Sequence, residues 1–197
     1  MKRLAIAAIG VVSLIASSTL LAQANVRVRG TIGEVGADAL KVRSRDGRDI
    51  ELRLAPDLQV SVPKKAGAAD FKPGSYIGVT SVRDAGGRLV AKRVHALGPQ
   101  VPQMHGAWDS IPGSTMTNAN LVASARVAGG SEITLKYKDG EQKILVTPET
   151  EYYTFGPGSR DDLKPGETIF AGARVDGEGR FMAQRVVVSK DGVKPPQ

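Results

Sequence analysis

Residues 40–54 read LKVRSRDGRDIELRL. On both sides of Asp46-Gly47, apolar residues alternate with polar ones, which is the pattern of strands with one buried face. An Asp-Gly pair favours a tight hairpin turn, because glycine accepts the positive φ that such turns require. The stretch therefore predicts two antiparallel strands joined at Asp46-Gly47.

The motifs of this region recur later in the chain. Lys72-Pro73-Gly74 is repeated as Lys164-Pro165-Gly166, and Ala91-Lys92-Arg93-Val94 returns as Ala183-Gln184-Arg185-Val186. Both offsets are the same, since 164 − 72 and 183 − 91 each give 92 residues. Matched turn motifs in one order predict an internal duplication.

Each copy contains a series of short predicted strands within roughly 70 residues. A sheet that small has exposed edges unless it closes on itself, and the OB-fold is a common closed form of this size. We therefore predict an all-β protein of two tandem small antiparallel OB-like β-barrels. An open sheet, or a sandwich formed by both copies, is the alternative. The residues expected inside the first barrel are Val28, Ile32, Leu40, Val42, Ile50, Leu52 and Leu54.

The first 24 residues read as a cleaved signal peptide. Lys2 and Arg3 precede the apolar run 4–21, and Ala22-Gln23-Ala24 is a suitable cleavage site. A retained membrane anchor is the alternative, because the run is about long enough to span a bilayer. No later segment is apolar enough to cross a membrane, so we expect a periplasmic or secreted mature chain. The expected divisions are 1–24 signal peptide, 25–97 first repeat, 98–119 Pro/Gly linker, 120–190 second repeat and 191–197 tail.

Several of these motifs resemble an exported bacterial domain family of unknown function. The resemblance is carried by Gly30-Thr31-Ile32, Leu40-Lys41-Val42, Lys72-Pro73-Gly74 and Gly87-Arg88-Leu89. It covers both copies, but the second copy departs at its start, where Ala123-Ser124-Ala125 replaces Gly30-Thr31-Ile32. The family is built from small OB-like β-barrels, often in tandem. The resemblance implies that fold and an exported location, and it assigns no catalytic or binding residues.

Composition argues against most kinds of catalysis. The chain has no Cys, which excludes thiol catalysis, disulfides and Cys-ligated zinc. It also lacks a nucleophile elbow, a phosphate-binding P-loop and a HExxH zinc motif. We therefore expect no enzyme and no cofactor.

Charge is concentrated in the first copy. Residues 26–97 hold 14 Lys/Arg against 8 Asp/Glu, whereas residues 120–189 hold 9 against 10. The strand pattern places five cations on one outer surface, and an ordinary solvated face is the alternative to attraction of a polyanion. Specific nucleic-acid binding is not expected, because the aromatic side chains for base stacking lie mostly in the second, slightly acidic copy. The polyanion-contact candidates are Arg27, Arg29, Lys41, Arg43 and Arg45.

The linker carries two further candidates. Met104, His105 and Met116 offer the soft thioether and imidazole ligands that copper(I) prefers. Trp108, the only tryptophan, is expected to pack against a barrel or between the barrels with its N–H bonded, and ligand contact is the alternative. The sequence therefore favours a non-enzymatic envelope protein that binds an unknown partner or an anionic surface. Periplasmic metal handling through the linker is the alternative function.

Overall fold

The computed structural model describes residues 24–196, which form strands, two 3₁₀ turns and no α-helix. Residues 1–23 and 197 lie outside this range, and so does the expected signal peptide except for Ala24. No helix in the described range is both long and apolar enough to cross a membrane. The strands are β1 (Ala24–Val35), β2 (Ala39–Ser44), β3 (Asp49–Lys65), β4 (Tyr76–Arg83), β5 (Leu89–Ala96), β6 (Met104–Trp108), β7 (Ser114–Val127), β8 (Gly130–Tyr137), β9 (Gly140–Val146), β10 (Glu151–Pro157), β11 (Thr168–Val175) and β12 (Phe181–Val188); the 3₁₀ turns are η1 (Ala68–Asp70) and η2 (Arg160–Asp162).

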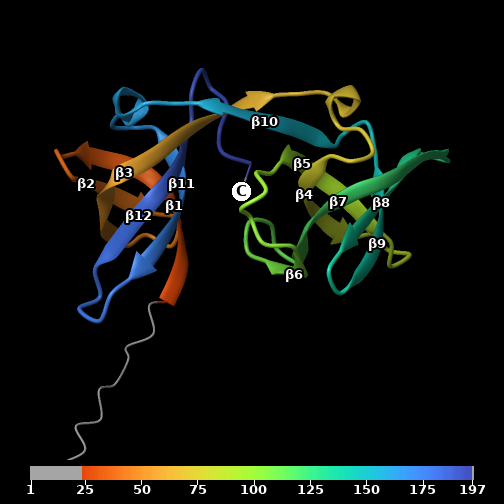
Figure 1. Cartoon of the computed structure of the whole chain (residues 1–197), viewed down its shortest axis with the longest axis horizontal. Helices are drawn as coiled ribbons and strands as arrows, with labels where there is room; N and C mark the ends of the chain where they lie inside the picture. Colours follow the sequence, from red (N-terminus) through yellow and green to blue (C-terminus); the bar gives the residue numbers. More distant parts are fainter. Residues whose placement is uncertain (1–23, 197) are drawn as a thin grey trace, which may run out of the picture.

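Five strands close into a β-barrel in the order β1, β2, β3, β12, β11, with β11 pairing back to β1. We call this the first barrel; it lies on the left of Figure 1. The predicted hairpin at Asp46-Gly47 joins β2 to β3, and Gly47 has a φ of 85°. All seven residues predicted to lie inside are buried in one apolar cluster, so the alternation along these strands identified the inner face correctly.

A second group of five strands also pairs in a cycle, in the order β4, β5, β9, β8, β7. We call this group the second ring; it lies on the right of Figure 1. Its apolar cluster includes Ile77, Val79, Leu135 and Ile144. β6 adds to the outside of the ring by pairing with β7, so the expected linker is partly strand.

The two segments predicted to be copies do not close separately, because each group of strands takes its last hairpin from the other segment. The first barrel takes β1–β3 from the first copy and β11–β12 from the second, while the second ring takes β4–β5 from the first copy and β7–β9 from the second. This differs from the expectation that each copy closes on itself. The physical reason lies in β3, which runs unbroken for 17 residues and carries the chain out of the first barrel.

β10 returns the chain in the opposite direction. It pairs antiparallel with the end of β3, where Gly156 lies opposite Val62, and parallel with β5, where Tyr153 lies opposite His95. In Figure 1 the end of β3 and β10 run along the top between the two groups of strands. The barrel and the ring are thereby joined into one twelve-stranded sheet.

Candidate anion-binding site

Strand pairing brings the predicted cations of β1 and β2 together. Thr31 lies opposite Arg43, and the Arg45 amide donates a hydrogen bond to the Arg29 carbonyl at 3.0 Å. Side chains two residues apart on a strand share a face, so Arg27, Arg29, Arg43 and Arg45 occupy one surface. These four arginines form what we call the arginine face.

The fifth candidate, Lys41, is placed differently. It lies farther along β2, and its ammonium group pairs with Glu34 at 2.7 Å. This exposed ion pair raises the pKa of Lys41, chiefly through the hydrogen bond to Glu34. The same strand end carries Glu51 opposite Lys41, so the local charge there is not positive. Lys41 is therefore not part of the arginine face.

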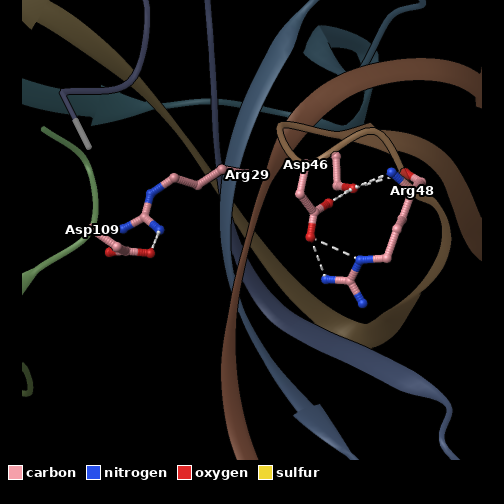
Figure 2. Close-up of polar contacts among 5 residues, drawn as sticks. Arg29, Asp46, Arg48 and Asp109 are labelled. Carbon is pink, nitrogen blue, oxygen red and sulfur yellow. Dashed lines mark hydrogen bonds and ion pairs between the residues drawn. The ribbon is translucent and has the colours of Figure 1, made fainter. Parts of the chain in front are cut away.

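Arg29 is the buried member of the arginine face, with 8% of its side chain exposed. Its Nη1 donates to Asp109 Oδ2 at 2.5 Å, and Figure 2 shows Arg29 reaching from β1 to Asp109 on the segment after β6. Its guanidinium carbon lies 5.3 Å from the ring centre of Trp108 and 5.1 Å from that of Phe170. An ion pair and two aromatic faces therefore fix the orientation of this guanidinium.

The pKa values of Arg29 and Asp109 keep both side chains charged at neutral pH. Burial lowers the pKa of Arg29, while its hydrogen bond to Asp109 and the charge of Asp109 oppose the shift. An arginine pKa begins so high that the side chain stays protonated. Partial burial acts to raise the pKa of Asp109, but the hydrogen bond and charge of Arg29 outweigh it and the net shift is downward.

Trp108 lies between the barrel and the ring, as predicted. It belongs to β6, yet its ring contacts Arg27 of the first barrel, whose guanidinium carbon is 4.1 Å from the ring centre. The prediction that its indole N–H is hydrogen-bonded is wrong, because the buried Nε1 has no hydrogen-bond partner among the described residues. The indole is held through its π face, which attracts cations, rather than through its N–H edge.

A cavity of about 430 Å³ opens beside Arg29. Five cations from distant parts of the chain line it, and the described residues place no carboxylate in the lining. The cations come from β1, β2, the turn after β2, β5 and the tail, so the cavity lies between the barrel and the ring. We call it the basic cleft; its polar lining comprises Arg29, Thr31, Arg43, Ser44, Arg45, Arg93, Ser110, Thr168 and Lys194.

Several polar groups in the lining of the basic cleft lack partners. Arg29 Nε and Nη2, Ser110 Oγ and Thr168 Oγ1 are buried and make no hydrogen bond to any described residue. Leaving a buried donor unsatisfied costs about 1–3 kcal/mol. Such groups are rare in native proteins and require an explanation. The lining therefore has hydrogen-bonding capacity that the protein itself does not use.

The charges in the basic cleft are only partly balanced. Arg43 pairs with Asp49 at 2.9 Å and Arg93 pairs with Glu151 at 3.2 Å, both acids lying outside the lining. Together with the Arg29–Asp109 pair, these contacts leave two cations of the cleft, Arg45 and Lys194, without an ion pair within residues 24–196. Arg48 is not available to the cleft, because Asp46 holds it in the hairpin turn at 2.8 Å (Figure 2).

The three metal candidates do not come together. In the β6–β7 register, His105 lies opposite Thr117 and its Nδ1 is 2.9 Å from the Thr117 hydroxyl. Met104 is adjacent to His105 on the strand and Met116 lies opposite Gly106, so both methionines are on the other face of the pair. Within the described range no three His, Asp or Glu side chains group as metal ligands.

The remaining histidine, His95, is fully buried in the second ring. Burial lowers its pKa to about 4, and the charge of Arg93 adds to the shift. Phe155 of β10 approaches the imidazole edge-on, with ring centres 6.0 Å apart. His95 therefore stays neutral at ordinary pH and belongs to the packing between β5 and β10.

Sequence reasoning missed four polar residues of the basic cleft. Arg93, Ser110, Thr168 and Lys194 lie on four separate segments, and although Arg93 belongs to the repeated motif 91–94, that motif does not indicate its place beside the arginine face. Their proximity follows from the exchange of hairpins, which alternation within a strand does not encode. Only the three arginines of β1 and β2 could be anticipated, because neighbouring strands of one hairpin region carry them.

Comparison with known proteins adds no assignment. No family model, curated protein or solved structure matches this chain. The family resemblance and the exported location therefore stay predictions.

Proposed function

We propose that this protein is a non-enzymatic exported envelope protein that acts as a binding or accessory module, and that its basic first copy attracts an anionic surface. The observation that carries the proposal is the arginine face. Arg27 and Arg43 are exposed there on the paired strands β1 and β2, and Arg45 is exposed in the turn that follows β2. Guanidinium groups bind phosphate and carboxylate oxygens in a bidentate manner, and several on one face attract a polyanion over a distance.

The proposal includes the finer architecture. We propose two OB-like barrels that arose by duplication, as in the exported family that the motifs resemble, and that have exchanged their last hairpins. The first copy provides three strands, a 3₁₀ turn and a hairpin, and the second provides the same order with the counterpart of the long β3 divided into β9 and β10. The register of the strand pair that closes each group also repeats. In the first barrel Leu52 lies opposite Phe181, and in the second ring Ile144 lies opposite Leu89. Ile144 is 92 residues after Leu52, and Leu89 is 92 residues before Phe181. This correspondence supports a common origin of the two copies.

Among polyanions, the arrangement favours an anionic lipid surface. Binding of single-stranded nucleic acid relies on aromatic side chains on which bases stack. On the arginine face the one nearby indole is already covered by Arg27, at 4.1 Å from the ring centre. Exposed arginines around a broad face suit lipid headgroups, which present phosphate without requiring stacking.

Vesicle binding by the mature chain, residues 25–197, tests this function. We expect retention on vesicles containing phosphatidylglycerol and none on phosphatidylcholine alone. Retention should weaken from low to moderate salt, because the Debye length falls to about 8 Å at physiological ionic strength. The whole chain is required, since an isolated copy lacks the hairpin that completes its strands.

Two matched triple variants distinguish retention caused by the arginine face from retention caused by net charge alone. Replacing Arg27, Arg43 and Arg45 by Ser should abolish retention, whereas replacing the exposed second-copy cations Lys136, Lys138 and Lys164 by Ser should reduce it only slightly. Arg29 is left intact because it is buried. Equal losses in the two triple variants, or retention that ignores salt, would contradict the proposal, provided that both variants keep the wild-type urea midpoint.

A further inference from the structure

We infer that the basic cleft is a specific site for one small phosphate-type oxyanion, a phosphate monoester or inorganic phosphate, rather than a part of a diffuse cationic surface. The inference deepens the proposed function and rests on it, because it assigns a discrete ligand class to one end of the arginine face. It differs from that function in stoichiometry, in location and in the residues it needs.

The first support is the convergence of charge. Arg43 comes from β2, Arg45 from the turn after it, Arg93 from β5 and Lys194 from the tail, yet all line one cavity of about 430 Å³. Like charges brought together in a concave site repel each other more strongly than on an open surface, since less water lies between them. An anion in the cavity offsets this repulsion. The volume lies in the range of about 300–1,000 Å³ that small-molecule sites occupy.

The second support is the set of unpartnered groups. The side chain of Arg29 is 92% buried, and the residue lines the cavity. Two of its guanidinium nitrogens have no hydrogen-bond partner among the described residues. Ser110 and Thr168 line the same cavity, and their buried hydroxyl oxygens also have no partner among the described residues. A phosphate group offers several acceptor oxygens and is matched by guanidinium and hydroxyl donors. The same ligand would therefore satisfy both the charge and the hydrogen-bonding capacity of the cleft.

The third support is preorganisation. Asp109 Oδ2 accepts from Arg29 at 2.5 Å, and the rings of Trp108 and Phe170 flank the guanidinium at 5.3 and 5.1 Å. A side chain already fixed in place loses little rotamer freedom when a ligand arrives, which favours binding. Because Arg29 belongs to the first barrel and Trp108 to β6, an oxyanion in the cleft would tie the barrel to the ring.

The tail gives the cleft one of its walls. Lys194 and Pro195 line the cavity, and Pro196 is buried. In Figure 1 the end of the chain lies between the barrel and the ring. Bound phosphate would contact the tail through Lys194, so we expect ligand to protect the tail from proteolysis as well as to change the environment of Trp108.

The test is a titration of the mature chain with inorganic phosphate and with glycerol 3-phosphate, followed by calorimetry and by the fluorescence of the single tryptophan. We expect saturable binding with one site per chain. Arg93→Gln and Lys194→Gln should each weaken binding by about tenfold or more, as expected for a lost charged hydrogen bond. The control is Lys92→Gln, which removes an exposed cation next to Arg93 that does not line the cleft and should bind as wild type does.

The outcomes distinguish this inference from the proposed function. Vesicle retention without saturable phosphate binding overturns the inference alone, and so does phosphate binding that both Gln variants at the cleft leave unchanged. Saturable phosphate binding without vesicle retention supports the inference and overturns the proposed function. If phosphate binds and Arg93→Gln also lowers retention on phosphatidylglycerol vesicles, the ligand is a lipid headgroup; if retention is unchanged, it is a soluble phosphate.

Discussion

The first barrel and the second ring use the same strand order but close to different extents. β12 pairs with β3 from Phe181 opposite Leu52 as far as Val187 opposite Ser61. The second ring closes only where Leu89 and Val90 of β5 meet Ile144 and Leu145 of β9. Strands held by fewer ladder hydrogen bonds open at lower free energy, so we expect the ring to open before the barrel.

Both groups bury polar atoms that lack a hydrogen-bond partner among the described residues. In the first barrel these are Arg29 Nε and Nη2 and Thr168 Oγ1, whereas in the second ring β4, β5 and β7 bury Thr80, His95 and Asn118. Thr80 Oγ1, His95 Nδ1 and Asn118 Oδ1 have no partner within the described chain. A buried polar atom without a hydrogen-bond partner lowers the free energy of unfolding, because its interactions with water are lost and not replaced. Because both groups carry such atoms, the shorter closure of the second ring is the feature that should make it the weaker of the two.

The largest effect should come from matched truncations in the two cores. Leu52→Ala in the first barrel and Ile144→Ala in the second ring remove equivalent, fully buried side chains. Each should lower the free energy of unfolding by roughly 2–5 kcal/mol. Urea denaturation measures both, with Val122→Ala as the exposed control. An unchanged midpoint for Leu52→Ala would refute the assignment of the inner face of β3.

Acid should destabilise the second ring through His95. The folded state keeps this imidazole neutral with a pKa of about 4, against the ordinary histidine pKa of 6.5 in the unfolded chain. The unfolded chain therefore binds the extra proton between these values, and stability that is complete above pH 6.5 is lost as the pH falls toward 4. The full loss is about 3 kcal/mol, because one pKa unit corresponds to 1.36 kcal/mol.

Unfolding midpoints measured from pH 7.5 down to pH 4 give this loss. His95→Gln should flatten the dependence over that range. His105→Gln is the matched control, because burial also lowers the pKa of His105 but leaves it partly exposed. An equally steep acid loss in His95→Gln would show that other groups are responsible.

A smaller effect comes from two equivalent turn glycines. Gly87 in the β4–β5 turn has a φ of 83° and Gly179 in the β11–β12 turn has a φ of 77°, and neither would bring a Cβ into contact with neighbours. Ala at either position should therefore cost only the backbone penalty, roughly 1–2 kcal/mol. Hydrogen exchange should rise in the second ring for Gly87→Ala and in the first barrel for Gly179→Ala, because the hairpins are exchanged. The reverse assignment would contradict the exchange.

Local pattern predicted the strands and faces but not the partners. The alternation from Leu40 to Leu54 was sufficient to identify the buried face of the first barrel, and neighbouring strands placed Arg29, Arg43 and Arg45 together. The hairpins β4–β5 and β11–β12 carry the same alternation and the same turn glycines. Each therefore fits the apolar face of either group, and only the unbroken length of β3 decides which one it joins.

For the same reason the basic cleft could be predicted only in part. Its residues Arg93 and Lys194 reach the arginine face because β5 and the tail lie beside a barrel built largely from other segments. Spacing along the chain carries no record of that proximity. The metal candidates illustrate the opposite error, in which residues close in the sequence are predicted to meet but do not. Met104 and Met116 lie on one face of the β6–β7 pair, and His105 lies on the other.

Cysteine cross-linking tests the exchange of hairpins most directly, because the chain has no native thiol to interfere. Ser81 of β4 lies opposite Thr115 of β7, and their hydroxyl oxygens are 3.0 Å apart. Ala173 of β11 is the counterpart of Ser81, since 173 − 81 is 92. Copies that closed on themselves would therefore bring Ala173 to Thr115. We expect Ser81→Cys/Thr115→Cys to form an intramolecular disulfide in the folded monomer and Thr115→Cys/Ala173→Cys to stay reduced; the opposite result would contradict the exchange.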